Sequence, residues 1–186
     1  MRLILASASP RRAELLTTAG FEFQVSAADV DETPAPQEEP TSYALRVARD
    51  KAEAIARNGS DADAIILAAD TVVVIDEEIL GKPRDNEDAR RMLRLLSGRV
   101  HDVHTAVVVR RGINEQSTIA TTRVWFHSLD ELEISWYVAS GEPDGKAGAY
   151  AIQGRAARFI ERIDGSWSNV VGLPVAAVYR LLLELL

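Results

Sequence analysis

The chain has 186 residues, 47% of them hydrophobic, so it is long enough to bury a sizeable core as a single domain spanning residues 1–186. Its 28 acidic and 21 basic residues give a formal net charge of −7, whereas general nucleic-acid-binding proteins usually carry a basic excess, so we expect no nucleic-acid partner. The absence of cysteine excludes disulfides, thiolate nucleophiles and zinc-thiolate sites, which fits a reducing cytoplasm.

The first half of the chain mixes strand patterns with helix patterns. Ser9 and Pro10 are typical of the start of a helix, and Gly20 is typical of its end. In chain order the pattern predicts a strand at 3–6, a helix from Ser9 to Gly20, a strand at 21–25, an acidic, proline-rich loop at 29–40, a helix at 41–57 and a buried strand at 65–75.

The second half continues the mixture. Ser128 and Glu131 form the pattern of a capping box, in which two side chains satisfy backbone N–H groups at the start of a helix. The pattern predicts a turn at 76–78, a helix from Asn86 to Gly98, strands at 100–109 and 116–126, a helix from Ser128 to Gly141, a small-residue loop at 144–154, a strand at 158–163 and an amphipathic helix after Pro174. Because strands and helices do not alternate strictly, we expect an α/β fold with a mixed sheet.

No apolar segment approaches the ~20 residues that cross a membrane. The apolar run at 3–6 is also too short for a secretion signal. We therefore expect a cytoplasmic protein with no membrane partner.

Two arginines stand where a helix disfavours them. Arg11 and Arg12 fall in the first turn of the predicted N-terminal helix, where the helix dipole is positive. A bound polyanion would remove the conflict, because backbone N–H groups, Ser7 and the two guanidinium groups would all point to phosphate oxygens. The alternative is that both arginines are solvated and paired with Glu14 or another carboxylate.

Asp70 is a second anomaly, because it lies inside the apolar strand pattern at 66–74. Aspartate is poorly suited to a strand, and burying its charge without a partner is costly. Asp70 therefore needs a lysine in a buried salt bridge, a metal ion, or a chemical role as a general base.

Three further charged residues stand out by their positions. Lys51 flanks the apolar stripe of its predicted helix, and Lys82 lies in Gly81-Lys82-Pro83, directly after a strand pattern. Glu32 belongs to the acidic cluster 29–32, whose oxygen ligands would suit a hard cation such as Mg²⁺. Taken singly, each of these residues is more often a solvated surface residue.

The segment 146–154 has almost no side-chain bulk. Small residues let a ligand approach the backbone closely, and Gln153 offers the donor and acceptor that reading the edge of a base requires. The alternative is an ordinary flexible loop. The chain has no phosphate-binding P-loop, dinucleotide-binding glycine motif or serine-hydrolase elbow, and its histidines show no metal-ligand spacing, so we interpret them as structural.

A series of short segments carries a family pattern. In order they are 5–12, 48–52, 69–73, 81–83, 96–99, 141–143, 146–150, 152–154 and 170–174. Each is a weak signal alone, but their order and spacing are specific. Together they resemble the Maf family of nucleoside triphosphate pyrophosphatases over nearly the whole chain.

The resemblance implies hydrolysis between the α and β phosphates of a nucleoside triphosphate, which gives a nucleoside monophosphate and pyrophosphate. It also implies a divalent metal cation, Mg²⁺ or Mn²⁺, and commonly a homodimer. The implied fold is an elongated mixed β-sheet flanked by helices, with two lobes around a nucleotide cleft, of the Maf and inosine triphosphatase-like kind.

The resemblance further assigns roles to residues of this chain. Asp70 aligns with the family's catalytic proton acceptor. The positions tied to substrate choice are Arg11, Thr71 and Gln153, and the other cleft residues are Ser7, Arg12, Glu32, Lys51 and Lys82. We expect the basic residues among them to offset the triphosphate charge, and Glu32 or Asp70 to bind the metal.

The segments 146–150, 152–154 and 165–169 resemble the branch of the family that acts on dTTP and UTP. Two residues depart from that branch: Ala151 stands where it usually has glycine, and Trp167 where it usually has tyrosine, so the preferred base stays open. The alternatives are a 7-methyl-GTP pyrophosphatase, a non-catalytic nucleotide-binding regulator of cell division, and a phosphomonoesterase that releases orthophosphate.

Overall fold

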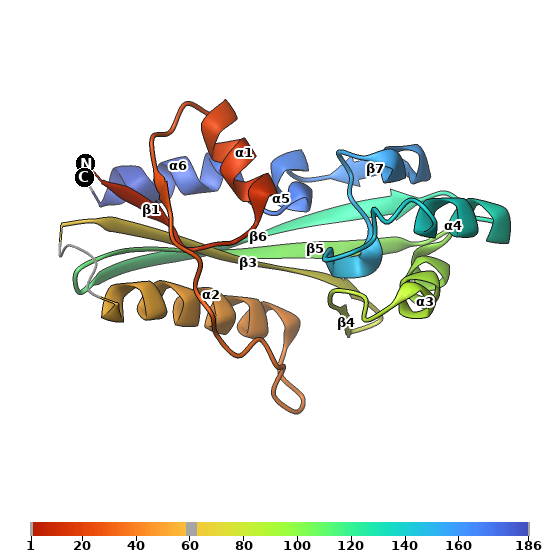
Figure 1. Ribbon diagram of the computed structural model, residues 1–186, viewed down its shortest axis with the longest axis horizontal. Coiled ribbons are helices and arrows are strands. Elements are labelled where there is room, and N and C mark those ends of the chain that lie inside the picture. The colour runs from red at the N-terminus through yellow and green to blue at the C-terminus, as the bar shows by residue number, and fades with distance from the viewer. Residues whose placement is uncertain (1, 59–62, 186) are drawn as a thin grey trace. The chain divides into compact units, whose positions relative to one another are not determined.

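The computed structural model of the chain describes residues 2–58 and 63–185. Its strands are β1 (Leu3–Leu5), β2 (Gln24–Val25), β3 (Ile65–Ile75), β4 (Glu78–Leu80), β5 (Val100–Arg111), β6 (Asn114–Phe126) and β7 (Ile160–Asp164). Within the described residues they form one seven-stranded sheet in the order β2-β1-β3-β5-β6-β7, with β4 paired to β3 (Figure 1). Parallel pairs join β1 to β2 and β3, whereas β3–β4 and β6–β7 are antiparallel, so the predicted mixed sheet is confirmed.

Helices flank this sheet, as the sequence predicts. They are α1 (Pro10–Thr18), α2 (Pro40–Arg57), α3 (Asn86–Leu96), α4 (Glu131–Val138), α5 (Trp167–Val171) and α6 (Val175–Glu184), with short 3₁₀ helices η1 (Ala147–Ala149) and η2 (Arg155–Phe159). α1 and α2 both begin with proline, which lacks the N–H that a first helical turn leaves without a partner.

The chain divides into two compact units. The first contains the residues up to Thr71, the segment Thr105–Ala120 and the residues from Gly172 onward. The second contains Val72–His104 and Thr121–Val171. Strands β3, β5 and β6 therefore contribute residues to both units.

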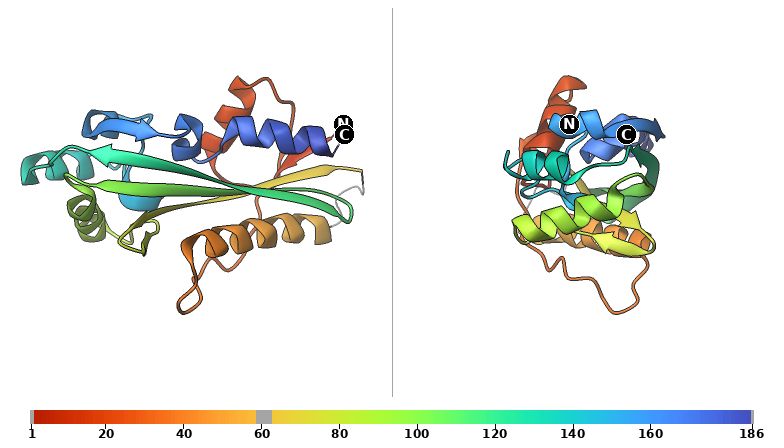
Figure 2. Two further views of the ribbon diagram at one scale, coloured as in Figure 1. Left: turned by 180° about the vertical axis from the view of Figure 1, so that it is seen from behind. Right: turned by 90° about the vertical axis from the view of Figure 1, so that its right-hand side faces the viewer.

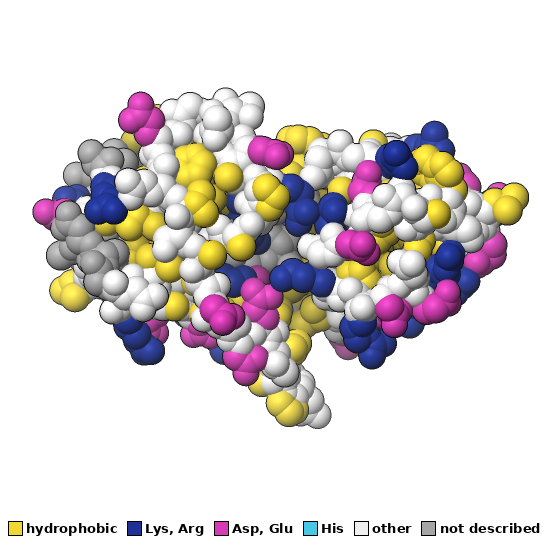
Figure 3. Space-filling view, in the orientation of Figure 1, with side chains coloured by type: hydrophobic (Ala, Val, Ile, Leu, Met, Phe, Trp, Pro, Cys, Tyr) yellow, Lys and Arg dark blue, Asp and Glu magenta, His cyan; other side chains and the backbone are white. Residues whose placement is uncertain are grey.

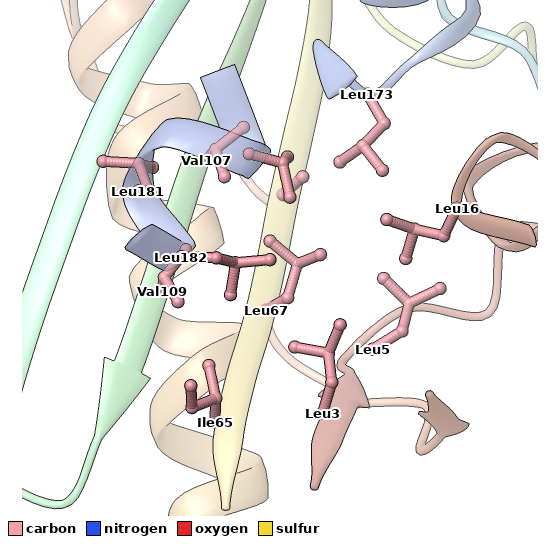
Figure 4. Packing of buried hydrophobic residues seen from close by; sticks show 12 residues of the cluster. Leu3, Leu5, Leu16, Ile65, Leu67, Val107, Val109, Leu173, Leu181 and Leu182 are labelled. Atoms are coloured by element: carbon pink, nitrogen blue, oxygen red, sulfur yellow. The ribbon is translucent and has the colours of Figure 1, made fainter. Parts of the chain in front are cut away.

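In the first unit, β3 presents alternate residues to two helical layers. Figures 1 and 2 show α1 and α6 over one face of the strands and α2 over the other. Ile65, Leu67 and Ala69 are buried in one cluster with side chains from α1 and α6 (Figure 4). Because side chains alternate along a strand, Asp70 points to the α2 face and Thr71 to the α1 face. This alternation places two polar side chains on opposite faces at the end of the core.

In the second unit, aromatic rings form the core. Phe126, Tyr137, Tyr150 and Phe159 are buried, and their ring centroids lie 5.0 to 6.2 Å apart in edge-to-face or tilted pairs. Such pairs contribute about 0.5–1.5 kcal/mol each beyond the area they bury. The cluster holds β6, α4 and the segment from residue 147 to residue 159 together.

The predicted capping box that begins at Ser128 is wrong by two residues. The N-cap of α4 is Asp130, whose carboxylate accepts the Glu133 N–H at 2.8 Å, while the Glu133 carboxylate accepts the Asp130 N–H. The preceding chain is held elsewhere, because the Leu129 N–H donates to Ser97 Oγ at 2.7 Å. A tertiary contact therefore selects one of two possible caps.

The sequence pattern predicts some elements of the structure and not others. β3 has the predicted bounds, whereas the bounds of β4, and the presence of α5 and the two 3₁₀ helices, were not predicted. The turn predicted at 76–78 is present as Asp76 and Glu77, both with positive φ (49° and 66°), and Glu78 already belongs to β4. Asparagine or glycine usually marks such a turn, and neither is present here.

Charges of both signs are interspersed on the face drawn in Figure 3, where lysine and arginine side chains lie among aspartates and glutamates. Within the described part of the chain, none of the helices has the length and apolar character that crossing a bilayer requires.

Candidate active site

Arg12 is the centre of a buried polar network in the first unit. Its Nε donates to the Gly172 carbonyl at 2.8 Å, and its Nη1 donates to the Ala69 carbonyl at 2.8 Å and to Ser7 Oγ at 3.1 Å. Its Nη2 donates to Thr71 Oγ1 at 3.1 Å. Burial lowers the pKa of Arg12, and the nearby Asp70 carboxylate opposes that shift. The guanidinium thus ties the chain before α1 to the middle of β3 and to the chain before α6.

Arg11, the next residue along the helix, is in a different environment. It is only partly buried, whereas Arg12 is 8% exposed. Burial lowers the pKa of Arg11, and the Glu14 carboxylate opposes that shift. Successive helix residues point about 100° apart, so one arginine faces the core and the other faces outward. Arg11 is therefore the more accessible guanidinium for a phosphate.

Asp70 meets Lys51 on the opposite face of β3. Lys51 Nζ lies 2.7 Å from Asp70 Oδ1 and 2.6 Å from Glu32 Oε1. Asp70 and Lys51 are each 7% exposed. One buried ammonium thus holds two carboxylates together, and the lysine partner that the sequence left as one option for Asp70 is present.

Helix α2 supplies a second support for this cluster. Tyr43 and Lys51 lie on one face of α2 because they are separated by two turns. The Tyr43 hydroxyl donates to the Glu32 backbone carbonyl at 2.7 Å. Burial, followed by the charges of Asp70 and Glu32, raises the pKa of Tyr43 to about 12, so this hydroxyl stays a donor at neutral pH. Tyr43 was missed in the sequence, although its spacing from Lys51 was a usable signal.

Thr71 continues the network on the α1 face of β3. Its hydroxyl lies 2.9 Å from Thr105 Oγ1 and 3.3 Å from the Gly172 carbonyl. Thr105, in β5, was not singled out in the sequence, because only strand pairing brings it to Thr71. The structure therefore brings six of the predicted residues together as two groups of three in the first unit, on opposite faces of β3: Ser7, Arg12 and Thr71, and Glu32, Lys51 and Asp70.

Lys82 and Gln153 belong to the second unit, where both are exposed. The loop of Lys82 is attached to the small-residue segment, because the Gly148 N–H donates to the Gly81 carbonyl at 3.1 Å. Gly148 has a φ of +67°, and a Cβ built on it would lie 2.9 Å from methyl carbons of Val73. The close approach of the Val73 side chain, rather than of a ligand, therefore explains why this position is a glycine.

The histidines in β5 have ordinary partners. His101 is buried, and its Nε2 lies 2.8 Å from the Tyr150 hydroxyl. Burial lowers the pKa of His101 to about 3, so its ring is neutral at neutral pH. His104 Nδ1 lies 2.9 Å from Thr121 Oγ1. These contacts support a structural interpretation.

The donor set at Asp70 fits a cation shared with a phosphate. Among the residues that the structure describes, no group of three or more histidines and carboxylates could hold a metal by itself. Two carboxylates, Asp70 and Glu32, converge on Lys51 Nζ. Mg²⁺ is usually held by one or two carboxylates while substrate phosphates and water complete its coordination. The residues present supply the one or two carboxylates of that mode, each with one oxygen bound to Lys51.

Several known proteins are similar to this chain over almost its whole length. Residues 2–185 match the profile of the Maf-like protein family. A dTTP/UTP pyrophosphatase of Anaeromyxobacter dehalogenans is 52% identical over 97% of this chain and 92% of its own length. The dTTP/UTP pyrophosphatase of Myxococcus xanthus is 51% identical over 97% of this chain and 90% of its own. The dTTP/UTP pyrophosphatase of Hahella chejuensis is 47% identical over 98% of this chain and 92% of its own length.

Solved structures resemble the chain more weakly. The Ham1 protein of Staphylococcus aureus aligns with a TM-score of 0.49 and 14% identity, covering 68% of this chain and 72% of its own. A nucleoside-triphosphatase / dITP/XTP pyrophosphatase of Mycobacterium abscessus aligns with a TM-score of 0.42 and 14% identity, covering 68% and 73%. The profile match and the high identities, taken with the joined motif residues, show that this chain belongs to the Maf-like protein family.

Proposed function

We propose that this protein is a dTTP/UTP pyrophosphatase, which hydrolyses the bond between the α and β phosphates and releases a nucleoside monophosphate and pyrophosphate. The observation that carries the proposal is the buried Asp70 carboxylate held by Lys51, in a chain about half identical to proteins of that name. A buried, oriented carboxylate at the end of a core is suited to proton abstraction.

Asp70 is the general base in this proposal. Lys51 binds Oδ1 at 2.7 Å, so Oδ2 is the oxygen that accepts the proton of the attacking water. The water oxygen bonds to the α phosphorus, the bridging P–O bond breaks, and its electron pair leaves with pyrophosphate. The Lys51 contact holds the Asp70 carboxylate in one orientation.

Basic side chains offset the charge of the triphosphate in this proposal. Arg11 is accessible and carries a planar fork that matches phosphate oxygens. We assign Lys82 to the phosphates as well. Arg12 and Ser7 act at the same site chiefly by holding the chain, because the Arg12 hydrogen bonds run to four protein acceptors. Thr71 is positioned by Arg12 and contributes to substrate choice.

A divalent cation, Mg²⁺ or Mn²⁺, is part of the proposal. Glu32 would hold it, or Asp70 through the oxygen that does not take up the proton, since carboxylate oxygens are of the type that hard cations prefer. When bound, such a cation neutralises charge on phosphate oxygens and on the leaving pyrophosphate. Lys51 keeps the two carboxylates together and limits their mutual repulsion.

Gln153 reads the base in this proposal. Its amide offers one acceptor and two donors, which suits the edge of thymine or uracil. Ala151 is 6% exposed, so its methyl group is largely covered by protein. We further propose that residues 1–186 work as one Maf-type domain, in a cytoplasmic homodimer that binds no nucleic acid and no membrane.

Nucleotide hydrolysis by the purified protein tests the function. dTTP, UTP, CTP, GTP, ATP and 7-methyl-GTP are incubated with Mg²⁺ or Mn²⁺, and pyrophosphate and orthophosphate are assayed separately. Pyrophosphate from dTTP and UTP is expected. Pyrophosphate mainly from 7-methyl-GTP would reassign the base, and orthophosphate alone would overturn the reaction. Light scattering after size-exclusion chromatography tests the homodimer.

A further inference from the structure

A buried pair of polar side chains in the second unit lies outside the proposed catalytic machinery. Tyr137, in α4, is fully buried, and its hydroxyl donates to Glu142 Oε1 at 3.0 Å. The same hydroxyl oxygen accepts the Ala151 N–H at 3.1 Å. Burial, and next the Glu142 charge, raise the pKa of Tyr137, so the hydroxyl keeps the proton that it donates. Tyr137 thus connects α4 to the chain just before Gln153.

Glu142 fastens the chain just after Gln153. Its Oε2 accepts the Arg155 N–H at 3.1 Å, and its Oε1 accepts the Ala156 N–H at 3.4 Å. These are the first N–H groups of η2, which no residue within that helix can satisfy. Gly154 fits against the same carboxylate, since a Cβ built there would lie 2.4 Å from Glu142 Oε1.

The two contacts enclose one short turn. The Gly154 N–H donates to the Ala151 carbonyl at 3.0 Å, which closes the turn, and Gln153 lies exposed within it. Ala151 precedes Gln153 by two residues and Arg155 follows it by two, so both ends of the turn are attached to the Tyr137–Glu142 pair. The pair contacts backbone N–H groups at both ends of the turn.

We propose that Tyr137 and Glu142 are positioning residues that fix the Gln153 turn and thereby set which base the enzyme accepts. The proposal rests on the proposed function, in which Gln153 reads the base. It also explains the Gly141-Glu142-Pro143 and Ile152-Gln153-Gly154 segments together: one supplies the carboxylate and the other supplies the glycine that lies against it.

UTP and CTP are suitable probes because they share sugar and phosphates and differ only at the base edge. Uracil presents an acceptor and a donor where cytosine presents a donor and an acceptor, so a fixed amide favours one of them. An amide on a loosened turn can rotate or shift to accept either base. Loss of the contacts made by Tyr137 and Glu142 is therefore expected to reduce the selectivity between UTP and CTP more than it reduces turnover.

The test variant is Tyr137→Phe, which removes only the hydroxyl. Its matched control is Tyr150→Phe, which removes another buried hydroxyl from the same aromatic cluster, one that contacts His101. We expect Tyr137→Phe to reduce the UTP-to-CTP ratio of kcat/KM by about tenfold, the effect of losing one orienting hydrogen bond. The KM for UTP rises while kcat for UTP changes less than about twofold. Tyr150→Phe leaves the ratio unchanged.

A double variant separates positioning from a merely structural effect. If Tyr137 acts only through Gln153, Tyr137→Phe has no effect on selectivity once Gln153 is replaced. The double variant Tyr137→Phe/Gln153→Ala is then no less selective between UTP and CTP than Gln153→Ala alone. Losses that multiply in the double variant, or an unchanged ratio in Tyr137→Phe, would overturn the proposal. Glu142→Gln, which keeps the shape but loses the acceptor for Arg155, is expected to fall between wild type and Tyr137→Phe.

Amide hydrogen exchange gives a readout that does not depend on turnover. Exchange of the Ala151, Arg155 and Ala156 amides is expected to quicken in Tyr137→Phe and to stay at the wild-type rate in Tyr150→Phe. If the wild-type protein releases no pyrophosphate, the proposed function is wrong, and base selectivity is then measured as the UTP-to-CTP ratio of dissociation constants. If the enzyme is active but amide exchange in Tyr137→Phe is unchanged, only the positioning role is wrong.

Discussion

The adjacent arginines of α1 give a prediction that separates a positioning role from a binding role. Arg12 donates to four acceptors, including the carbonyls of Ala69 and Gly172 at 2.8 Å each. Lysine offers a single compact ammonium, which cannot reach acceptors spread around the edge of a guanidinium group. We expect Arg12→Lys to lose two of the four hydrogen bonds, with the abandoned carbonyls left buried.

The magnitude follows from the charge on the donor. Hydrogen bonds to charged groups contribute about 1.5–3 kcal/mol each, so Arg12→Lys is expected to lower the free energy of unfolding by about 3–6 kcal/mol. The matched control is Arg11→Lys, one residue away and partly exposed. It keeps the charge and loses a bidentate contact, so we expect a change in stability under about 0.5 kcal/mol together with a raised KM for dTTP.

Urea unfolding followed by far-ultraviolet circular dichroism measures the first effect, and pyrophosphate release at varied dTTP measures the second. The two neighbouring arginines are expected to give opposite results. Equal stability of Arg12→Lys and wild type would contradict a stabilising role for the buried network. A large loss of stability in Arg11→Lys would contradict the assignment of Arg11 to phosphate binding.

Other variants probe the remaining contacts. Lys51→Met leaves the buried Asp70 without its ammonium, so urea unfolding is expected to show a loss of about 3–5 kcal/mol. Gly148→Ala combines a φ of +67° with a Cβ 2.9 Å from Val73, so a loss of about 1–3 kcal/mol is expected, seen as a lower Tm. The pKa of His101 falls from 6.5 in the unfolded chain to about 3 in the native protein, so the unfolded state binds more protons between those values. Stability is therefore lost as pH falls below about 6.5, at up to about 1.4 kcal/mol per pH unit, and His101→Gln flattens that slope between pH 6.5 and 5.

Much of the fold was readable in the sequence where one physical cause dominates. β3 has its predicted bounds because a long run of buried apolar residues ends at a charged turn. The bounds of β4 were not predictable, since three residues become a strand only by pairing with β3. The start of α4 was misplaced because two patterns of the capping type overlap, and only the contact of Leu129 with Ser97 decides between them.

The site was predictable in its members but not in its connections. Asp70 could be identified because it is a charged residue within an apolar strand pattern, and Lys51 was singled out independently by its position. Their contact could not be predicted, because only the packing of α2 on β3 brings the two side chains together. Arg11 and Arg12 had the same sequence signal, and helix geometry gives them different surroundings. Thr105 carried no sequence signal, because the pairing of β5 brings it to the site.

The most direct test of the account is the turnover of Asp70→Asn with dTTP. Asparagine keeps the shape of the side chain and lacks the proton-accepting carboxylate, while Glu32 still pairs with Lys51 at 2.6 Å. If Asp70 is the general base, Asp70→Asn is folded by circular dichroism and its kcat for pyrophosphate release is reduced by about 10²–10⁴-fold. A folded Asp70→Asn protein that releases pyrophosphate at close to the wild-type rate would contradict it.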